Sequence, residues 1–459
     1  MNFWQMARGV LVGLAFLVAG APAHAQTDPA EWLERLRALP GVSSAVQASS
    51  SIPGTYFYRL TFRQPVDHAV PDGATFEQRF TVLHRDAIAP LVLVTDGYGS
   101  SMNASQAELT HYLAANQIRV EHRFFNASTP TPRDWAKLTI AQSAADLHAI
   151  NLSLKSLYPS GWVSTGASKS GMTSLYYRYY YPDDVQATVP YVAPTSHGTY
   201  DRRYATFLST LGPSDCRTKM QAFQVAALQQ REAILPLIQD GQHAHLGKDR
   251  ALEFAVLETP FTFWQYLSEP SCSQIPPATA TPAQLLEFIN AVVGIEFYGD
   301  ATLDYYAPYF YQSATQLGGP GYEEKHLASL LRYPGEDVPE NYPPANVNKL
   351  FDAGLMPAVE YWVLTQARRF IFIYGQNDPW STNAFRRMAR NESYRFVVPG
   401  QDGNHGAKLV TLTPAERDSA LAKLRTWLGM TPKAIEASKK AALTPPPVRT
   451  LMNEDRYLR

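Results

Sequence analysis

The chain has 459 residues, of which 45% are hydrophobic and 18% are charged. A chain of this length and composition can bury a large core, which excludes a disordered protein and predicts one enlarged domain or a core with an insertion. The formal net charge of −1 and the sequence pI near 6.8 leave no basic surplus to neutralise phosphates, so nucleic-acid binding is excluded as a function class.

The first 25 residues have the pattern of an export signal. Arg8 precedes an apolar run over residues 9–20, and Ala23-His24-Ala25 precedes Gln26. A positive start, a short apolar run and small residues at the cleavage site are typical of a secretory signal peptide. The run is shorter than the roughly 20 residues that span a bilayer. We therefore expect residues 1–25 to be removed, and the mature protein to be secreted or periplasmic with no membrane partner.

Strand and helix patterns alternate through the first part of the mature chain. Apolar or alternating runs separated by Pro and Gly turns predict strands, and runs with helical spacing predict helices. The expected strands cover 56–62, 80–84, 91–94, 118–121, 162–165 and 187–192, and the expected helices cover 106–115, 140–157 and 172–180. Such alternation predicts an α/β core over residues 26–199, with a mostly parallel sheet covered on both faces.

The alternation stops after Pro194. Residues 200–361 contain helix-like stretches at 219–235 and 282–292, Pro-rich joints and clustered aromatic residues, but no clear βα repeat. This segment is expected to be an inserted, largely helical lid.

The sheet pattern then returns over residues 362–430. It predicts strands at 370–374 and 394–398, a helix after Ser381, and a last helix in which Thr413 is the N-cap of a capping box. The polar residues 431–459 predict a mobile tail or strap.

Cys216 and Cys272 are the two cysteines of the chain. In an exported protein an even pair is expected to form a disulfide, and the alternative is two buried thiols.

Residues 162–171 run from a predicted strand into a predicted helix through small residues. This is the context of a nucleophile elbow, a strained turn that presses together the residues two before and two after the nucleophile. Ser168 has Gly166 and Ser170 at these positions, whereas Ser164 or Ser170 as nucleophile would place a bulky side chain there. The sequence therefore predicts Ser168 as the nucleophile of an α/β-hydrolase fold.

A serine nucleophile needs a base, and the base needs an acid to orient it. In this fold the chain order is nucleophile, acid, base. Asp378 follows the strand at 370–374, and His405, the last histidine of the chain, follows the strand at 394–398. We predict Asp378 as acid and His405 as base. Asp402 is the rival acid, and a turn-forming Asp and a loop His are the structural alternatives.

Two backbone N–H groups are expected to stabilise the oxyanion of the reaction. One belongs to Lys169, directly after the nucleophile. The other is assigned to Tyr98 or its neighbour, in the Gly-rich segment that follows the strand ending at Val94. The alternative for this segment is a plain Gly-rich turn.

These motifs resemble those of the S37 peptidases, the prolyl tri/tetrapeptidyl aminopeptidase group, and more distantly the S28 prolyl peptidases. The resembling segments span most of the mature chain and lie at residues 96–98, 121–125, 164–173, 263–266, 374–380 and 403–406. The resemblance implies an exported serine peptidase that releases tri- or tetrapeptides from free N-termini and favours proline at the cleaved position. Ser170 and Asp96 depart from the family pattern, which has Gly and commonly Glu there.

The lid offers aromatic faces on which a proline ring could stack, and Trp264 and Tyr266 are the candidates. An exopeptidase also needs an acid to hold the substrate's ammonium group. Glu121, Asp96 and lid residues such as Glu258 are the candidates for this role. Glu121 has an internal ion pair as its alternative.

Two other functions remain open from the residues alone. An esterase or lipase shares the scaffold, and a non-catalytic binding protein could keep the fold. No metal or cofactor is expected, because His243 and His245 form a short pair without an obvious third ligand and phosphate-loop and dinucleotide motifs are missing from the sequence. The expected partners are peptides with a free N-terminus.

Overall fold

The computed structural model describes residues 28–387 and 391–446. The expected signal peptide lies outside these ranges. Within them a nine-stranded sheet forms in the order β1-β2-β3-β5-β4-β6-β7-β8-β9. Its strands are β1 (Val42–Ala48), β2 (Tyr56–Pro65), β3 (Thr75–His84), β4 (Leu91–Thr95), β5 (Asn116–Val120), β6 (Trp162–Ala167), β7 (Ala187–Tyr191), β8 (Ile371–Gly375) and β9 (Tyr394–Val398).

Most of the sheet is parallel. The strands β5, β4, β6, β7, β8 and β9 pair in parallel, whereas β1, β2 and β3 form an antiparallel edge that joins the rest where β3 pairs with β5. The α/β-hydrolase prediction is thereby confirmed, and its predicted strands are present. The sequence reading missed β1, whose polar residues give a weak apolar pattern.

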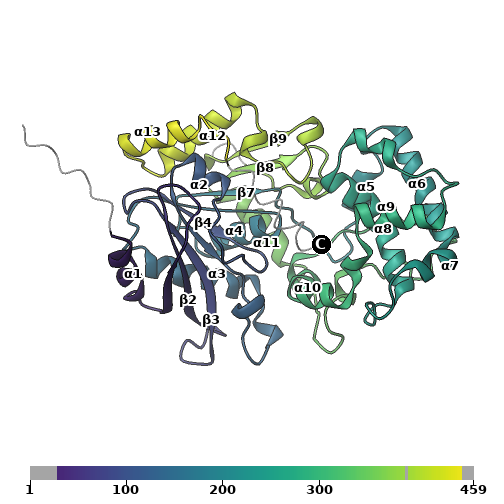
Figure 1. The fold of residues 1–459 in the computed structure, drawn as a ribbon, viewed down its shortest axis with the longest axis horizontal. Coiled ribbons are helices and arrows are strands. Elements are labelled where there is room, and N and C mark those ends of the chain that lie inside the picture. Colours follow the sequence, from purple (N-terminus) through teal and green to yellow (C-terminus); the bar gives the residue numbers. More distant parts are fainter. Residues whose placement is uncertain (1–27, 388–390, 447–459) are drawn as a thin grey trace, which may run out of the picture.

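Helices cover both faces of the sheet (Figure 1). Successive side chains of a strand point to opposite faces. Leu91 and Leu93 of β4 accordingly pack with α3 (Ile140–Leu154) and α4 (Lys169–Tyr180), whereas Val92 and Val94 pack with α2 (Glu108–Tyr112) and α12 (Pro414–Trp427). Helix α1 (Pro29–Arg37) packs against the antiparallel edge. The fully buried strands explain the continuous apolar runs in the sequence.

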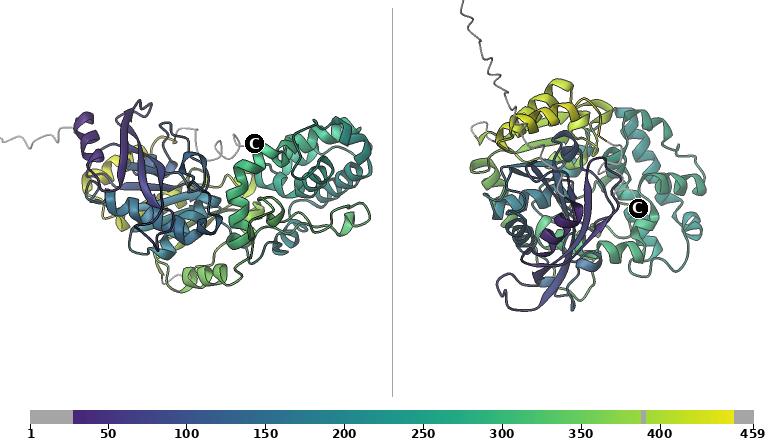
Figure 2. Two further views of the ribbon diagram at one scale, coloured as in Figure 1. Left: turned by 90° about the horizontal axis from the view of Figure 1, so that it is seen from below. Right: turned by 60° about the vertical axis from the view of Figure 1, so that its left-hand side comes forward.

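A second, helical lobe lies between β7 and β8 and projects from the sheet (Figure 2). It has its own hydrophobic core, and the structure joins Cys216 to Cys272 by a disulfide within it. Its helices are α5 (Arg203–Leu208), α6 (Ser214–Gln229), α7 (Arg231–Ile234), α8 (Lys248–Tyr266), α9 (Pro282–Val292) and α10 (Asp300–Gln312). We call this lobe, residues 200–354, the lid.

Two details of the second part of the core differ from expectation. The expected lid boundary at residue 361 falls inside α11 (Leu355–Thr365), whose Met356 and Val359 pack against the sheet with Phe372, so α11 belongs to the core. A helix was expected after Ser381. Up to residue 387 the structure instead has only a short 3₁₀ turn, Pro379–Asn383.

The expected tail begins with a helix, α13 (Pro432–Ala441). The Ser438 hydroxyl in this helix donates to the Tyr112 carbonyl at 2.7 Å and accepts from Arg425 at 3.0 Å, which ties the helix to the core. Within the described ranges, the structure contains no helix that is both long and apolar enough to cross a membrane.

Candidate active site

Ser168 stands between β6 and α4 in a strained backbone conformation, with φ 53° and ψ −127°. A Cβ atom on Gly166 would lie 2.4 Å from the backbone carbon and oxygen of Ser170, so a side chain at position 166 is sterically excluded. The Ser168 N–H donates to the Tyr191 carbonyl at the end of β7 at 2.9 Å. The crowding that the sequence reading inferred two residues either side of Ser168 is present in the structure.

The two rival serines of the elbow point elsewhere. The Ser164 hydroxyl is buried between strands, 3.0 Å from the Thr188 hydroxyl. The Ser170 hydroxyl accepts a hydrogen bond from the Gly97 N–H at 2.9 Å. Of the three, Ser168 alone lines the large cavity described below.

Asp378 and His405 come together at the carboxyl end of the sheet. The Asp378 Oδ2 and the His405 Nδ1 are 2.8 Å apart, and both side chains are buried. Asp378 Oδ1 also accepts from the Trp380 N–H at 3.1 Å, which fixes the carboxylate at the start of its turn. A carboxylate at this place holds the proton on Nδ1, so that the neutral imidazole presents Nε2 as a base. The rival Asp402 is exposed.

The Nε2 atom of His405 is buried and has no hydrogen-bond partner among the described residues. Hydrogen bonds between a serine and its base are often long in a free enzyme and shorten when substrate binds. The rings of Tyr266 and Trp380 lie 6.2 and 6.3 Å from the imidazole, centroid to centroid. The lid also holds the histidine loop directly, because the His405 N–H donates to the Gln265 carbonyl at 2.9 Å.

The loop expected to provide the second oxyanion donor is clamped by the two residues that follow Ser168. The Lys169 ammonium donates to the Gly97 carbonyl at 2.5 Å, and Ser170 accepts from the Gly97 N–H. A Cβ on Gly97 would lie 2.8 Å from the Lys169 backbone, so the close approach requires glycine. Ser170 departs from the common elbow pattern, which has glycine at this position. Its hydroxyl accepts the Gly97 N–H, a hydrogen bond that a glycine side chain could not make.

Lys169 is buried, and this burial lowers its pKa to about 7. Its ammonium lies 5.4 Å from the centre of the Tyr98 ring. The Tyr98 ring in turn contacts Tyr306 and Tyr309 of α10 edge to face, at 5.5 and 5.6 Å. These contacts join the turn at Ser168, the Gly97–Tyr98 segment and α10 of the lid in one packed unit.

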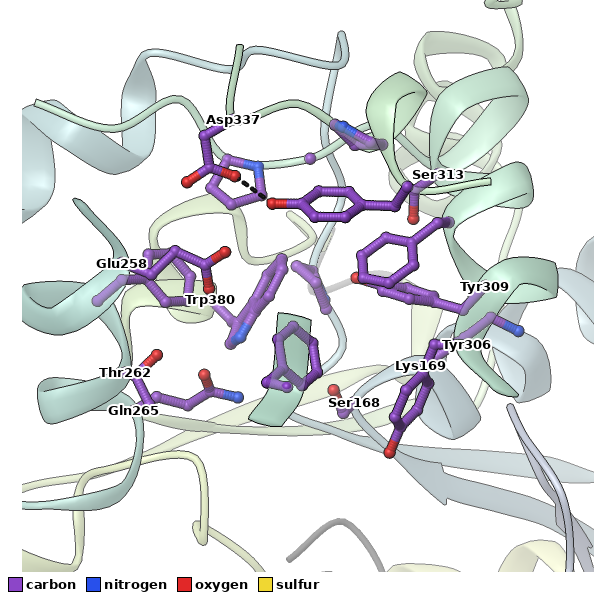
Figure 3. Close-up of a pocket in the computed structure, with 18 of the residues that line it drawn as sticks. Ser168, Lys169, Glu258, Thr262, Gln265, Tyr306, Tyr309, Ser313, Asp337 and Trp380 are labelled. Atoms are coloured by element: carbon purple, nitrogen blue, oxygen red, sulfur yellow. Dashed lines mark hydrogen bonds between the residues drawn. The ribbon is translucent and has the colours of Figure 1, made fainter. Parts of the chain in front are cut away.

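A cavity opens above Ser168, between the core and the lid (Figure 3). Its empty space, together with its mouth open to solvent, is about 1150 Å³. The core contributes Tyr98, Ser168, Lys169, Met172, Pro194 and Trp380. The lid contributes aromatic walls and two acids, through Glu258, Phe261, Tyr266, Tyr306, Tyr309, Phe310, Tyr322, Asp337 and Tyr342 among others.

Three expected substrate-binding residues do not line the cavity. Glu121 is fully buried, and its carboxylate accepts from Arg79, Ser100, Asn126 and Ser128 at 2.6–2.9 Å. Because these hydrogen bonds already use both carboxylate oxygens, Glu121 does not bind a substrate amine. The alternative interpretation, an internal ion pair, is the correct one. Asp96 is buried where β4 ends.

Trp264 was also expected at the substrate. It instead fills the lid core, where its ring occupies the space beside Gly212. Tyr266, two residues later on α8, lines the cavity as expected. A helix advances by about 100° per residue, so residues two apart face nearly opposite sides. The aromatic composition alone could not distinguish the two.

The sequence reading missed Asp337 and Trp380 as cavity residues. Trp380 lies in the same short segment as Asp378, and this proximity was the available signal. Asp337 lies in an irregular loop without a motif, far in sequence from the other site residues. Glu258, named only in general terms as a lid acid, lies in the cavity.

Comparisons with known proteins identify the family of this chain. The model of the PS-10 peptidase S37 family matches residues 25–453. A prolyl tri/tetrapeptidyl aminopeptidase from Streptomyces mobaraensis is 39% identical over 437 residues, which cover 92% of this chain and 91% of the relative.

Solved structures resemble the chain weakly. A proline iminopeptidase from Mycobacterium smegmatis has 14% identity and a TM-score of 0.35, with 84% of this chain and 98% of that one covered. The peroxisomal hydrolase Lpx1 from Saccharomyces cerevisiae has 12% identity and the same TM-score, with 83% and 92% covered. From the family match over nearly the whole chain and the 39% identical relative, we conclude that this protein belongs to the S37 family of serine peptidases.

Proposed function

We propose that this S37 peptidase removes tri- or tetrapeptides from free N-termini, with proline preferred at the cleaved position. The observation that carries the proposal is the position of Ser168, which lies on a strained elbow and opens into an aromatic cavity bounded by the lid. The name of the relative from Streptomyces mobaraensis agrees with this activity. An esterase or lipase on the same scaffold is the alternative that the experiment below separates.

In the proposed mechanism, Ser168 attacks the scissile carbonyl carbon while Nε2 of His405 takes the hydroxyl proton. Asp378 stabilises the imidazolium that forms. The backbone N–H groups of Lys169 and Tyr98 receive the oxyanion. The imidazolium then gives its proton to the leaving amine, and the acyl-enzyme on Ser168 is hydrolysed by a water that His405 activates.

Proline recognition is proposed to depend on the aromatic side chains next to the base. A proline ring offers an apolar face and no N–H donor, so stacking is the contact available to it. The rings of Trp380 and Tyr266 both line the cavity and flank His405. Their position beside His405 supports a contact with the residue whose carbonyl carbon is attacked by Ser168.

The test is a digest of unblocked decapeptides in which a single proline moves from position 2 to position 5, with the products weighed by mass spectrometry. We expect release of the N-terminal fragment when proline is third or fourth and little release otherwise. Cleavage that ignores the position of proline would contradict the proposal, and so would turnover of simple esters without turnover of any of the peptides.

Export is a further part of the proposal. The apolar run over residues 9–20 and the small residues before Gln26 support it. N-terminal sequencing of the protein from its native source should give Gln26 as the first residue. A mature chain that keeps residue 1 would contradict export by signal cleavage.

A further inference from the structure

Two carboxylates face the cavity on the side opposite Ser168 (Figure 3). Glu258 lies near the middle of α8, and Asp337 precedes the 3₁₀ turn Pro339–Asn341. They come from lid segments that are far apart in sequence, and most of their neighbours in the cavity wall are aromatic or apolar. Charged groups in such surroundings are costly unless a partner compensates them.

Asp337 has one protein partner and one oxygen without a partner. The Tyr342 hydroxyl donates to its Oδ1 at 2.6 Å. The Oδ2 atom is buried and makes no hydrogen bond within the part of the chain that the structure describes. The residue as a whole is only 2% exposed. Buried carboxylate oxygens normally have partners, so this one indicates a group that arrives from outside the chain.

The two acids lie close enough to affect each other. Burial raises the pKa of Asp337 well above its usual value, and the negative charge of Glu258 is the next cause. The pKa of Tyr322, another cavity residue, is also raised. Burial is the largest cause, and the negative charges of Glu258 and Asp337 are the next two. A positive charge between the two carboxylates would relieve this repulsion.

The chain does not supply that positive charge from the cavity wall. Among the residues that line the cavity, Lys169 is the one Lys or Arg, and its ammonium donates to the Gly97 carbonyl on the Ser168 side. A metal ion is not favoured, since the described residues contain no group of three His, Cys, Asp or Glu side chains that could hold one. A cation with N–H donors fits two carboxylates better.

We propose that Glu258 and Asp337 together bind the N-terminal ammonium group of the peptide whose scissile carbonyl lies at Ser168. This inference rests on the proposed aminopeptidase function. An ammonium group brings one charge and three N–H donors, which match the paired carboxylates and the open Oδ2 of Asp337. Because both ends of the bound peptide are then fixed, the separation of the acid pair from Ser168 determines how many residues are released.

The experiment compares Ala-Ala-Pro-p-nitroanilide with its N-acetylated form, in the wild type and in the variants Glu258→Gln and Asp337→Asn. We expect the wild type to prefer the free N-terminus. Each variant should lose about 10- to 100-fold in kcat/KM for the free substrate, mainly through KM, because a hydrogen bond to a charged group has been weakened. The acetylated substrate should be cleaved no more slowly than by the wild type.

Glu287→Gln is the matched control, because Glu287 is an exposed lid acid outside the cavity. It should leave both substrates unchanged. The rate of fluorophosphonate labelling at Ser168 reports whether each variant is folded. If Asp337→Asn does not fold, the Glu258→Gln variant alone tests the inference.

The inference is overturned if folded variants keep the wild-type preference for the free N-terminus. A wild type that cleaves both substrates equally overturns it as well. A wild type that cleaves neither substrate would instead refute the proposed function, so the two failures are distinguishable.

Discussion

The core and the lid contribute different things to one cavity. The core places Ser168, Asp378 and His405 at the carboxyl ends of β6, β8 and β9, where loops of parallel strands converge. The lid adds aromatic side chains and the acids Glu258 and Asp337. Fixed strand ends suit chemistry that needs defined geometry, whereas a helical lobe with its own hydrophobic core can vary its wall without disturbing the sheet.

Substitutions in the core should therefore stop the chemistry, whereas substitutions in the lid should change substrate choice or lid stability. The roles of core and lid are not fully separate, because the Gln265 carbonyl of α8 in the lid accepts a hydrogen bond from the His405 N–H in the core.

The largest effect is expected at the acid of the core. Asp378→Asn should lower kcat by about 10⁴-fold, because the amide no longer holds the proton on Nδ1 of His405. The thermal midpoint should change little in comparison. Steady-state kinetics on a proline-containing peptide amide measures the loss. Asp402→Asn, a change of the same kind in an exposed residue of the histidine loop, should keep near-native turnover, and a reversal of the two results would refute the assignment.

Trp264 and Tyr266 provide a matched pair within the lid. Trp264→Ala should reduce the free energy of unfolding by about 3–5 kcal/mol, because a buried ring is removed from the lid core. Its kcat/KM, corrected for the folded fraction, should stay near the wild-type value. Tyr266→Ala should show the reverse pattern. Denaturant unfolding and kinetics on both variants check this, and a Trp264→Ala enzyme that is stable but inactive would contradict the division.

The disulfide should stabilise the lid rather than the core. It closes a loop with a sequence separation of 56 residues, for which the chain-entropy model gives roughly 4 kcal/mol at most. The double variant Cys216→Ala, Cys272→Ala should therefore expose lid amides to hydrogen exchange before those of β4 and β6. Equal loss of protection in the lid and the sheet would show that the two unfold as one unit.

Lys169 predicts a pH dependence of stability. Its pKa in the folded protein is about 7, below the usual 10.5, so between these values the unfolded chain binds more protons. The free energy of unfolding should then rise with pH across this window, by up to about 1.4 kcal/mol per pH unit from this group. Denaturant unfolding at pH 7.5 and 9.5 should show this rise in the wild type relative to Lys169→Met. A constant difference between the two proteins would contradict it.

The core was predictable because its signals are local. The segments that form β4, β6 and β8 are short and rich in apolar residues. Ser168 could be chosen among its neighbouring serines because the residues two before and two after it are small, as a crowded turn requires. The acid and the base then follow from chain order. The Asp378–His405 hydrogen bond agrees with that order.

The lid was less predictable because its helices and loops do not follow the local sequence patterns on which the predictions depend. Helices α8 and α10 contain Pro260 and Pro308, which normally interrupt a helix, so neither was expected. Asp337 joins Glu258 only through tertiary packing of a loop that has no sequence pattern. Glu121 belongs to a recognisable motif, yet the structure uses its carboxylate for internal hydrogen bonds.

Trapping the acyl-enzyme would show which residue is the nucleophile of this peptidase. The enzyme would be mixed with the p-nitrophenyl ester of Ala-Ala-Pro, quenched in acid during turnover, digested and mapped by mass spectrometry. We expect an added tripeptidyl mass on Ser168, and we expect Ser168→Ala to abolish it. A tripeptidyl adduct on Ser164 or Ser170, or unchanged turnover by Ser168→Ala, would contradict it.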